Sequence, residues 1–315
     1  MTCARVAESA RDVRVDAGAL SRFAGLLAES GAVPTDWDTT NHYVGRAPDT
    51  TMYFLALDAV NFCFFAPLDR SRWEVDVDGR RLSGYVGMAA ALKRAVLDGR
   101  FELDARFFAE MTKARFAGIL GGEGFLPLMA ERAQSLRQTG GALMEYAGGD
   151  PLDFVGLARK SAVKFARLIA GTIPSFNDTA AYQGKTVYFH KRAQILASDL
   201  HGALDATGPG EFPDIGDLTC FADYKLPQVL RQAGVLEYSA ALAHNVDNMI
   251  PLAAGGPEEV EIRAATVHAV ELLRREMEGL GVARTSAAID WMIWNMGQDD
   301  AWREKPYHRV VTIYY

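Results

Sequence analysis

Cysteine is scarce in this chain of 315 residues. Its three cysteines, Cys3, Cys63 and Cys220, are odd in number and lie far apart. This excludes a disulfide framework and a zinc finger built from cysteine pairs. The six histidines include no pair four residues apart, and the HExxH motif is missing. We therefore expect no metal centre, and only a site assembled from distant histidines stays open.

Long apolar runs are missing too, and so is an excess of positive charge. No stretch of about 18 apolar residues could cross a bilayer, and the start, MTCARVAESARDVRVD, carries charges where a signal peptide is apolar. With 33 Lys and Arg against 40 Asp and Glu, the formal net charge is −7. This balance argues against wrapping duplex DNA or coating an anionic membrane, but it permits one basic phosphate pocket. We expect a soluble cytoplasmic protein without nucleic-acid or membrane partners.

What the sequence does contain is helical periodicity. Hydrophobic residues make up 49% and charged residues 23% of the chain, which is ordinary for a globular protein. Apolar residues recur at helical spacing, several stretches end at glycine, and Pro127 and Pro151 suit first helical turns. The pattern predicts helices over residues 17–30, 84–98, 127–147, 151–170, 189–206, 226–233, 238–248, 258–279 and 285–297.

Strand signals are few. Over residues 72–82 apolar residues alternate with charged ones, and Asp78-Gly79 supplies a hairpin turn. A second extended piece is expected at residues 186–189. The tail, residues 308–315, is either a short strand or an ordered extended end.

Three stretches interrupt the helical pattern. Residues 44–50 and 205–217 are linker-like, but each is short and equally suits a surface loop. The glycine-rich residues 118–125 have neither the Walker nor the GxGxxG spacing, so we interpret them as a loop between helices. We therefore predict a mainly α fold, with one compact domain over residues 1–315 and a small β-hairpin near 72–82.

Polar side chains that could bind a ring occur at residues 58–65. If this segment is helical, Asp58, Asn61, Phe62 and Phe65 share one face. A carboxylate, an amide and aromatic rings suit a flat ligand with hydrogen-bonding edges. The plainer interpretation is an amphipathic helix.

Adjacent cations lie near the expected start of the helix after residue 189. Lys191 and Arg192 fall outside its apolar stripe, and a cation near free backbone N–H groups could bind a phosphate. The alternative is a solvated basic turn.

Two further segments combine carboxylates with aromatic residues. Asp223, Tyr224 and Lys225 follow one another between apolar flanks, so Asp223 is either a helix cap or a carboxylate with a tuned pKa. Asp290 and Trp294 are neighbours four residues apart, and a carboxylate beside an indole suits a guanine-like edge. A tryptophan-rich core helix with one surface aspartate is the alternative.

These segments together resemble a known family. The resemblance extends from about residue 9 to residue 315, and its order, spacing and aromatic C-terminus agree with the queuosine salvage proteins, the queuosine 5′-phosphate N-glycosylases. The chain departs from that pattern in NFCFF, in Lys225 where Arg is common, and in its glycine-rich loop. The segments that carry the resemblance are NFCFF (61–65), SGYVGMAAALKRA (83–95), KRAQILASDL (191–200), FADYKLPQVL (221–230), EVEIRAATVHAVELLR (259–274), IDWMIW (289–294) and YHRVVTIYY (307–315).

The resemblance implies a fold, a reaction and a substrate. It implies an all-helical domain with some likeness to helix-hairpin-helix DNA glycosylases, and no metal or organic cofactor. The implied reaction is hydrolysis of the N-glycosidic bond of queuosine 5′-monophosphate to queuine and ribose 5-phosphate. A separate transglycosylase can then return queuine to tRNA. A non-catalytic queuine or nucleoside carrier, and a base glycosylase acting on nucleic acid, are the alternatives.

With this substrate in view, the candidate residues take expected roles. We expect Asp223 to be the catalytic carboxylate, with Lys191 as its electrostatic partner or as a phosphate ligand. The candidates for the phosphate site are Tyr224, Lys225, His308 and Arg309. The candidates for the base pocket are Asp58, Asn61, Phe62, Asp290 and Trp294.

Overall fold

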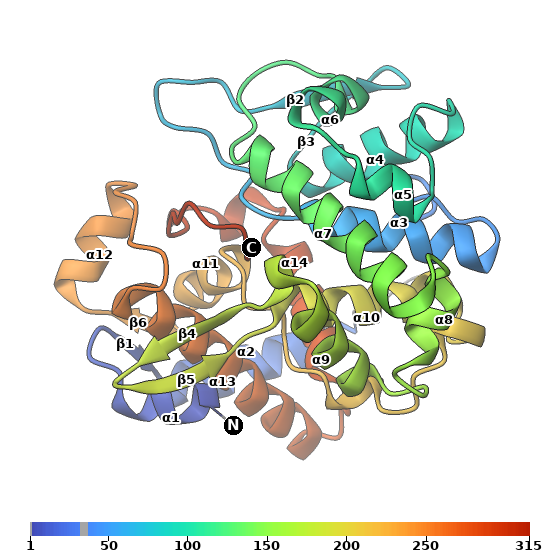
Figure 1. Cartoon of the computed structure of the whole chain (residues 1–315). Coiled ribbons are helices and arrows are strands. Elements are labelled where there is room, and N and C mark those ends of the chain that lie inside the picture. Colours follow the sequence, from blue (N-terminus) through green and yellow to red (C-terminus); the bar gives the residue numbers. More distant parts are fainter. Residues whose placement is uncertain (1, 32–36) are drawn as a thin grey trace.

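The computed structural model describes residues 2–31 and 37–315 of the chain. The fold is mainly α, as predicted, and small two-stranded antiparallel sheets accompany the helices (Figure 1). No helix in the described residues is both long and apolar enough to cross a membrane. The likeness to helix-hairpin-helix glycosylases stays a prediction.

The helices follow the predicted periodicity closely, with additional helices over residues 2–9, 47–60, 105–109 and 113–120. Their bounds are α1 Thr2–Ser9, α2 Ala17–Glu29, α3 Ala47–Val60, α4 Gly84–Leu97, α5 Ala105–Ala109, α6 Lys113–Leu120, α7 Met129–Ala147, α8 Pro151–Gly156, α9 Ala162–Thr172, α10 Lys191–Ala203, α11 Lys225–Gln232, α12 Ala240–Asp247, α13 Pro257–Gly279 and α14 Ser286–Met296. Short 3-10 turns occur at η1 Pro174–Phe176, η2 Gly208–Gly210, η3 Ile215–Asp217 and η4 Asp300–Trp302.

The strands form hairpins and one long-range pair. The predicted hairpin is confirmed, and both Asp78 and Gly79 have positive φ in its turn. The predicted extended piece at residues 186–189 overlaps a second hairpin, and the tail over residues 308–315 forms neither helix nor strand. The strand bounds are β1 Val13–Val15, β2 Glu74–Val77, β3 Arg80–Ser83, β4 Thr179–Tyr182, β5 Lys185–Tyr188 and β6 Leu236–Tyr238, paired as β1–β6, β2–β3 and β4–β5.

Three boundaries differ from the prediction. The single helix expected over residues 151–170 is two helices, because Arg159 and Lys160 take positive φ and Ser161 caps α9. The linker-like stretch 44–50 contains the first residues of α3. Pro127 precedes α7 instead of lying in its first turn.

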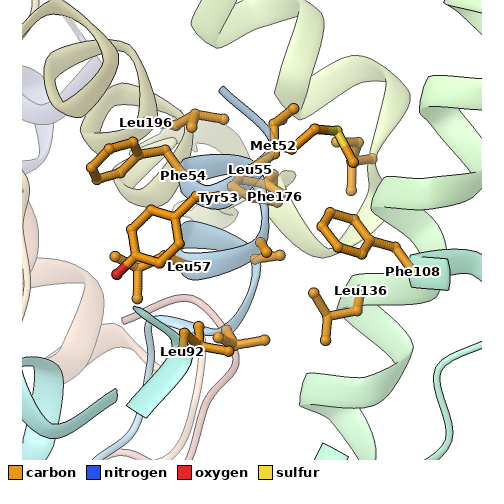
Figure 2. Packing of buried hydrophobic residues seen from close by; sticks show 14 of the residues in the cluster. Met52, Tyr53, Phe54, Leu55, Leu57, Leu92, Phe108, Leu136, Phe176 and Leu196 are labelled. Carbon is orange, nitrogen blue, oxygen red and sulfur yellow. The ribbon is translucent and has the colours of Figure 1, made fainter. Parts of the chain in front are cut away.

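The first hydrophobic core surrounds α3. All residues of this helix from Thr50 to Val60 are buried, which is typical of a helix covered on every side. Helices α4, α7, α8 and α10 pack against it. Figure 2 shows Phe54 beside Leu196 on one side of α3, and Phe108 with Leu136 on the opposite side.

A second core surrounds α13, and the candidate site lies where the two cores meet. Helices α1, α2, α11 and α14 pack against α13, whose buried face is apolar over most of its length. Candidate residues come from α3 and α10 of the first core and from α11 and α14 of the second. The packing of the two cores therefore decides which side chains meet.

Candidate functional site

Lys191 is at the centre of the candidate site. It is the first residue of α10, and it is only 6% exposed. Burial lowers the pKa of its ammonium group, while the carboxylates of Asp223, Asp58 and Asp290 raise it. Side chains that are far apart in sequence thus act on one buried cation, and the solvated basic turn considered above is excluded.

The start of α10 is held by a buried ion pair. Asp178 accepts hydrogen bonds from the Arg263 guanidinium, at 2.9 Å for one of its oxygens, and from the backbone N–H of Lys191 at 3.1 Å. Both side chains of this pair are 2% exposed. The contact ties α13 of the second core to the helix that carries Lys191.

Asp223 has one oxygen occupied and one available. Its Oδ1 accepts the backbone N–H groups of Lys225 at 2.7 Å and Leu226 at 3.0 Å, so the residue does cap the entry of α11. Among the described residues, none donates a hydrogen bond to Oδ2. A carboxylate fixed by two amides at a helix start, with one free oxygen, is well prepared to meet a positive charge.

Asp290 and Trp294 lie beside this carboxylate. Asp290 Oδ2 accepts the backbone N–H of Phe221 at 2.7 Å. Burial raises the pKa of Asp290 well above its usual value, and the nearby Asp223 charge raises it further. The partly buried Trp294 ring meets Tyr85 edge-on, with centroids 6.4 Å apart. The structure therefore brings Asp223, Asp290 and Trp294 into one region.

The segment after Val60 is not helical, so Asp58, Asn61 and Phe62 do not share the helical face that was predicted for residues 58–65. The helix α3 ends at Val60, Asn61 is its C-cap, and Cys63 has a φ of +48°. Asp58 is completely buried and accepts a 3.5 Å hydrogen bond from the Asn61 amide. Burial raises its pKa to about 7. The charges of Lys191 and Arg192 act on Asp58, and Asn61 contacts it from the loop after α3.

Phe62 has a different place from the one expected for it. Its ring is completely buried, and the guanidinium groups of Arg132 and Arg192 lie over it at 4.4 and 4.9 Å. Stacking a ligand base on this ring would require removing those contacts. Phe62 is a packing residue in this structure.

Tyr224, Lys225 and Arg309 gather around a second aromatic ring, Tyr307. The Tyr224 and Tyr307 centroids are 4.8 Å apart, and the charged ends of Lys225 and Arg309 lie 5.6 and 5.9 Å from the Tyr307 centroid. Burial lowers the pKa of Lys225, while Asp223 raises it. The charge of Arg72 also reaches Lys225. The cations thus collect on the side of Asp223 where α11 begins.

His308 does not join this group of cations. Its ring is 2% exposed, and Nε2 lies 3.2 Å from the hydroxyl of Tyr315. Burial, aided by the charge of Arg263, lowers the pKa of His308 to about 3. A neutral, buried imidazole offers no charge to a phosphate, so the expected phosphate contact is not supported.

Asp199, Tyr85 and His42 were not predicted. Asp199 lies two turns after Lys191 on α10, and one of its carboxyl oxygens is buried without a hydrogen bond in the described part of the chain. Burial raises its pKa well above the usual value, and so does the charge of Asp58. The spacing of eight residues places Lys191 and Asp199 on one helix face, which could have revealed this acid.

The described residues contain no group of three His, Cys, Asp or Glu side chains suited to a metal ion. A cleft of about 750 Å³ lies elsewhere, between α1, β1, β6 and α13. None of the candidate residues lines it, so the candidate site rests on the converging side chains around Lys191.

Comparisons with known proteins agree over nearly the whole chain. Residues 41–315 match the family model described as queuosine salvage protein. A protein of Sphaerobacter thermophilus named queuosine 5′-phosphate N-glycosylase/hydrolase is 43% identical over 314 residues, which cover 100% of this chain and 96% of that protein. Proteins of the same name from Bos taurus and Schizosaccharomyces pombe are 34% and 26% identical, each match covering 98% of this chain and 96% of the relative. The chain therefore belongs to the queuosine salvage protein family.

Proposed function

We propose that this protein hydrolyses the N-glycosidic bond of queuosine 5′-monophosphate, releasing queuine and ribose 5-phosphate, within one domain that spans residues 1–315. The observation that carries the proposal is the convergence of Asp223, Asp290 and Asp58 on the buried Lys191. Membership of the queuosine salvage family supports the choice of substrate, since the curated relatives are named for this reaction.

Cleavage of a glycosidic bond develops positive charge on the ribosyl ring. The electron pair of the C–N bond leaves with the base, water supplies hydroxide to the anomeric carbon, and its proton ends on the leaving base. Asp223 stabilises the developing cation, acts as base for water or attacks as nucleophile, with its available oxygen. Lys191 balances the surrounding carboxylates and is the proposed partner of Asp223.

The deazaguanine part of the substrate carries N–H donors on a flat ring. Asp290 supplies a carboxyl group, Trp294 supplies an indole face or edge, and Asn61 supplies an amide near the end of α3. We place Asp58 behind Lys191 instead of against the base, because its side chain is completely buried. Phe62 takes a packing role.

The 5′-phosphate requires cations and hydrogen-bond donors. We assign it to Lys225, Tyr224 and Arg309, which surround Tyr307 next to Asp223. His308 takes no part because it is buried and neutral. A net charge of −7 with one local group of cations suits a small nucleotide better than a nucleic acid, and we place the reaction in the cytoplasm.

A chromatographic assay tests the proposal. Purified protein is incubated with queuosine 5′-monophosphate and, in parallel, with the dephosphorylated nucleoside. We expect queuine release from the monophosphate, much faster than from the nucleoside. No release from either, together with tight queuine binding, would make the protein a carrier and overturn the proposal. Retention of tRNA on a filter, with base release from it, would instead favour a nucleic-acid glycosylase.

Asp223→Asn tests the catalytic carboxylate. The amide oxygen can still accept from Lys225 and Leu226, so we expect the fold to be kept while turnover falls by at least about 100-fold. Asp150→Asn is the matched control, because Asp150 caps α8 in the same way through Leu152 and Asp153. Full turnover in a folded Asp223→Asn variant would contradict the assignment.

A further inference from the structure

The backbone that leads to Lys191 is held by one buried residue, Asp178. The Asp178 carbonyl accepts the backbone N–H groups of Phe189 at 3.0 Å and His190 at 3.1 Å. Its carboxylate accepts the backbone N–H of Lys191 at 3.1 Å. His190 has a φ of +47°, which is unfavourable for a residue with a Cβ atom, so the entry of α10 needs this support. Asp178 therefore fixes three consecutive amides that end at Lys191.

Arg263 of α13 supplies the charge that this carboxylate requires. Its Nη1 and Nη2 atoms donate to the two Asp178 oxygens at 2.9 and 2.5 Å, and both side chains are 2% exposed. A carboxylate buried to this extent is strongly disfavoured unless a cation is paired with it. The charged form of Asp178, which binds the Lys191 amide more strongly than a neutral acid would, therefore depends on Arg263.

The same guanidinium also binds the segment that carries Asp223. Arg263 Nε donates to the backbone carbonyl of Ala222 at 3.2 Å, and Ala222 is 2% exposed. Ala222 immediately precedes Asp223, whose carboxylate is held by the amides of Lys225 and Leu226. The proposed catalytic carboxylate is thus fixed from both directions along the chain, and Arg263 provides the contact on the N-terminal side.

Aromatic rings hold this guanidinium in its place. Its central carbon lies 4.0 Å from the ring centroid of Phe189 and 4.4 Å from that of Tyr315, and both rings are buried. A guanidinium presents its donors in a rigid planar fork and stacks on aromatic faces, whereas a lysine ammonium is a point charge on a flexible stem. Lysine in place of Arg263 would keep the charge but could not form all of these hydrogen bonds at once.

We propose that Arg263 is a positioning residue that sets Lys191 and Asp223 relative to each other. It does so through the Asp178 carboxylate on one side and the Ala222 carbonyl on the other. The charges of Lys191 and Asp223 act on each other, and a displacement of about 1 Å in a catalytic group can cost about 100-fold in rate. The inference deepens the proposed glycosylase function and, for its kinetic consequences, rests on it.

Amide hydrogen exchange followed by NMR tests these contacts without any substrate. In Arg263→Lys we expect exchange to accelerate by about tenfold or more at the amides of Lys191, Lys225 and Leu226, because both segments lose support. The amide of Leu136, in the buried middle of α7, should keep its protection. Acceleration in only one of the two segments, or equal acceleration at all amides, would overturn the inference.

Asp178→Asn tests one side of the arrangement alone. The amide oxygen of asparagine can still accept from Lys191, but a neutral acceptor binds this N–H more weakly than a carboxylate does. We expect faster exchange at Lys191, while Lys225 and Leu226 keep their protection because Arg263 still binds the carbonyl before Asp223. Loss of protection in both segments would contradict separate contacts from one guanidinium.

Steady-state kinetics with queuosine 5′-monophosphate test the consequence for catalysis. Arg263→Lys is expected to lose about 10- to 100-fold in kcat with KM changed by less than about threefold, since the cations assigned to the phosphate are kept. Arg231→Lys is the matched control. Arg231 is buried, stacks on Tyr238 at 4.7 Å and donates to both oxygens of Asp247 at 2.7 and 3.0 Å, yet it is not part of the proposed site.

The control separates positioning from stability. Arg231→Lys should lower the unfolding temperature and leave kcat within about twofold of wild type, because only an ion pair outside the site is weakened. Equal losses of kcat in the two variants, or an unchanged kcat in Arg263→Lys, would overturn the inference. A wild-type protein that releases no queuine would refute the proposed function, while hydrogen exchange would still decide whether Arg263 holds both segments.

Discussion

At the scale of single residues, this protein has two buried arginine side chains that bind backbone carbonyls instead of carboxylates. Arg132 and Arg192 are 0% and 1% exposed, and neither forms an ion pair with a carboxylate within the described ranges. Arg132 donates to the carbonyls of Val60, Phe62 and Cys63, and Arg192 donates to those of Asp58 and Ala59. The last carbonyls of a helix lack N–H partners and carry partial negative charge. The two guanidinium groups therefore complete the end of α3, next to the site.

Arg132→Met should show what this arrangement contributes. Methionine fills a similar volume but leaves several buried carbonyls without donors, so we expect the free energy of unfolding to fall by about 3 kcal/mol or more. Urea denaturation measures it. Arg275→Met is the control, since Arg275 lies exposed on α13 and should change stability by less than about 0.5 kcal/mol. Equal losses in the two variants would contradict this account.

At this scale the sequence indicated which residues matter better than it indicated their surroundings. Periodicity left Lys191 and Arg192 outside the apolar stripe of α10, yet both side chains are buried. It could not show that Arg192 points into the carbonyls at the end of α3, because backbone acceptors leave no mark in a sequence. Phe62 was expected in the base pocket because the sequence could not show which side chains cover its ring. The cations that lie over it, Arg132 and Arg192, come from other helices.

Elements were predictable wherever a period and an end signal coincided. Helices α2, α4 and α10 have an apolar stripe with a stop nearby, and their predicted ranges agree with the observed ones. The break between α8 and α9 was not predicted, because Arg159 and Lys160 adopt a left-handed backbone that charged residues rarely favour. Likewise, the apolar residues after Val60 continue the helical pattern of the sequence, although the helix itself ends at Val60.

The glycine-rich loop shows how an element can be determined by close backbone contact. Glu123 exchanges backbone hydrogen bonds with Glu74 of β2, at 2.8 and 2.9 Å. Gly122 lies between them and Trp73, with a φ of +84°, and a Cβ there would come within 2.5 Å of the Glu74 carbonyl oxygen. The loop therefore supports the hairpin, and the segment before it carries Arg72, whose charge reaches Lys225.

Gly122→Ala should therefore destabilise the protein. The added methyl group meets backbone atoms and the φ is unfavourable for alanine, so we expect a loss of about 2 kcal/mol or more in the free energy of unfolding. Gly118→Ala in the same motif is the matched control. Gly118 is an exposed residue of α6 with open space around it, and alanine should stabilise this helix by about 0.5–1 kcal/mol. Thermal denaturation of both variants measures the opposite signs, and a neutral Gly122→Ala would refute the packing argument.

At the scale of the whole molecule, two hydrophobic cores are joined beside the site by the C-terminal tail. The Tyr315 carbonyl accepts a hydrogen bond from the backbone N–H of Cys63 at 2.8 Å. The Arg309 carbonyl accepts one from the backbone N–H of Leu252 at the same distance. The Arg263 guanidinium lies 4.4 Å from the Tyr315 ring centroid. Figure 1 accordingly marks the C-terminus near the middle of the molecule. The tail therefore connects the loop after α3 with α13.

The grouping of the site residues arises only at this scale. Asp58, Lys191 and Asp223 come from widely separated segments, and the packing of α3, α10 and α11 brings their charges together. Each segment offered an acid, an amide or a cation beside an aromatic residue, which made it a candidate. No local pattern could reveal that several acids would act on Lys191, or that His308, at the start of the tail, would be buried.

His308 makes the stability of this junction depend on pH. Its folded pKa of about 3 lies below the ordinary value of 6.5, so between these values the unfolded chain binds more protons than the folded one. Stability is therefore fully retained above pH 6.5 and is lost as the pH falls below it. Between pH 7 and pH 5 this single histidine should lower the free energy of unfolding by about 2 kcal/mol.

His308→Phe removes that titration. At pH 7 the variant should be about 1 kcal/mol less stable than wild type, because the hydrogen bond to Tyr315 is lost. At pH 5 the order should reverse by a similar amount, since wild type alone pays about 2 kcal/mol for protonating the imidazole. Guanidinium denaturation at pH 5, 6 and 7 follows the difference between the two proteins. A constant difference across this range would mean that water reaches His308 in the folded protein, and that the tail does not seal the junction of the two cores.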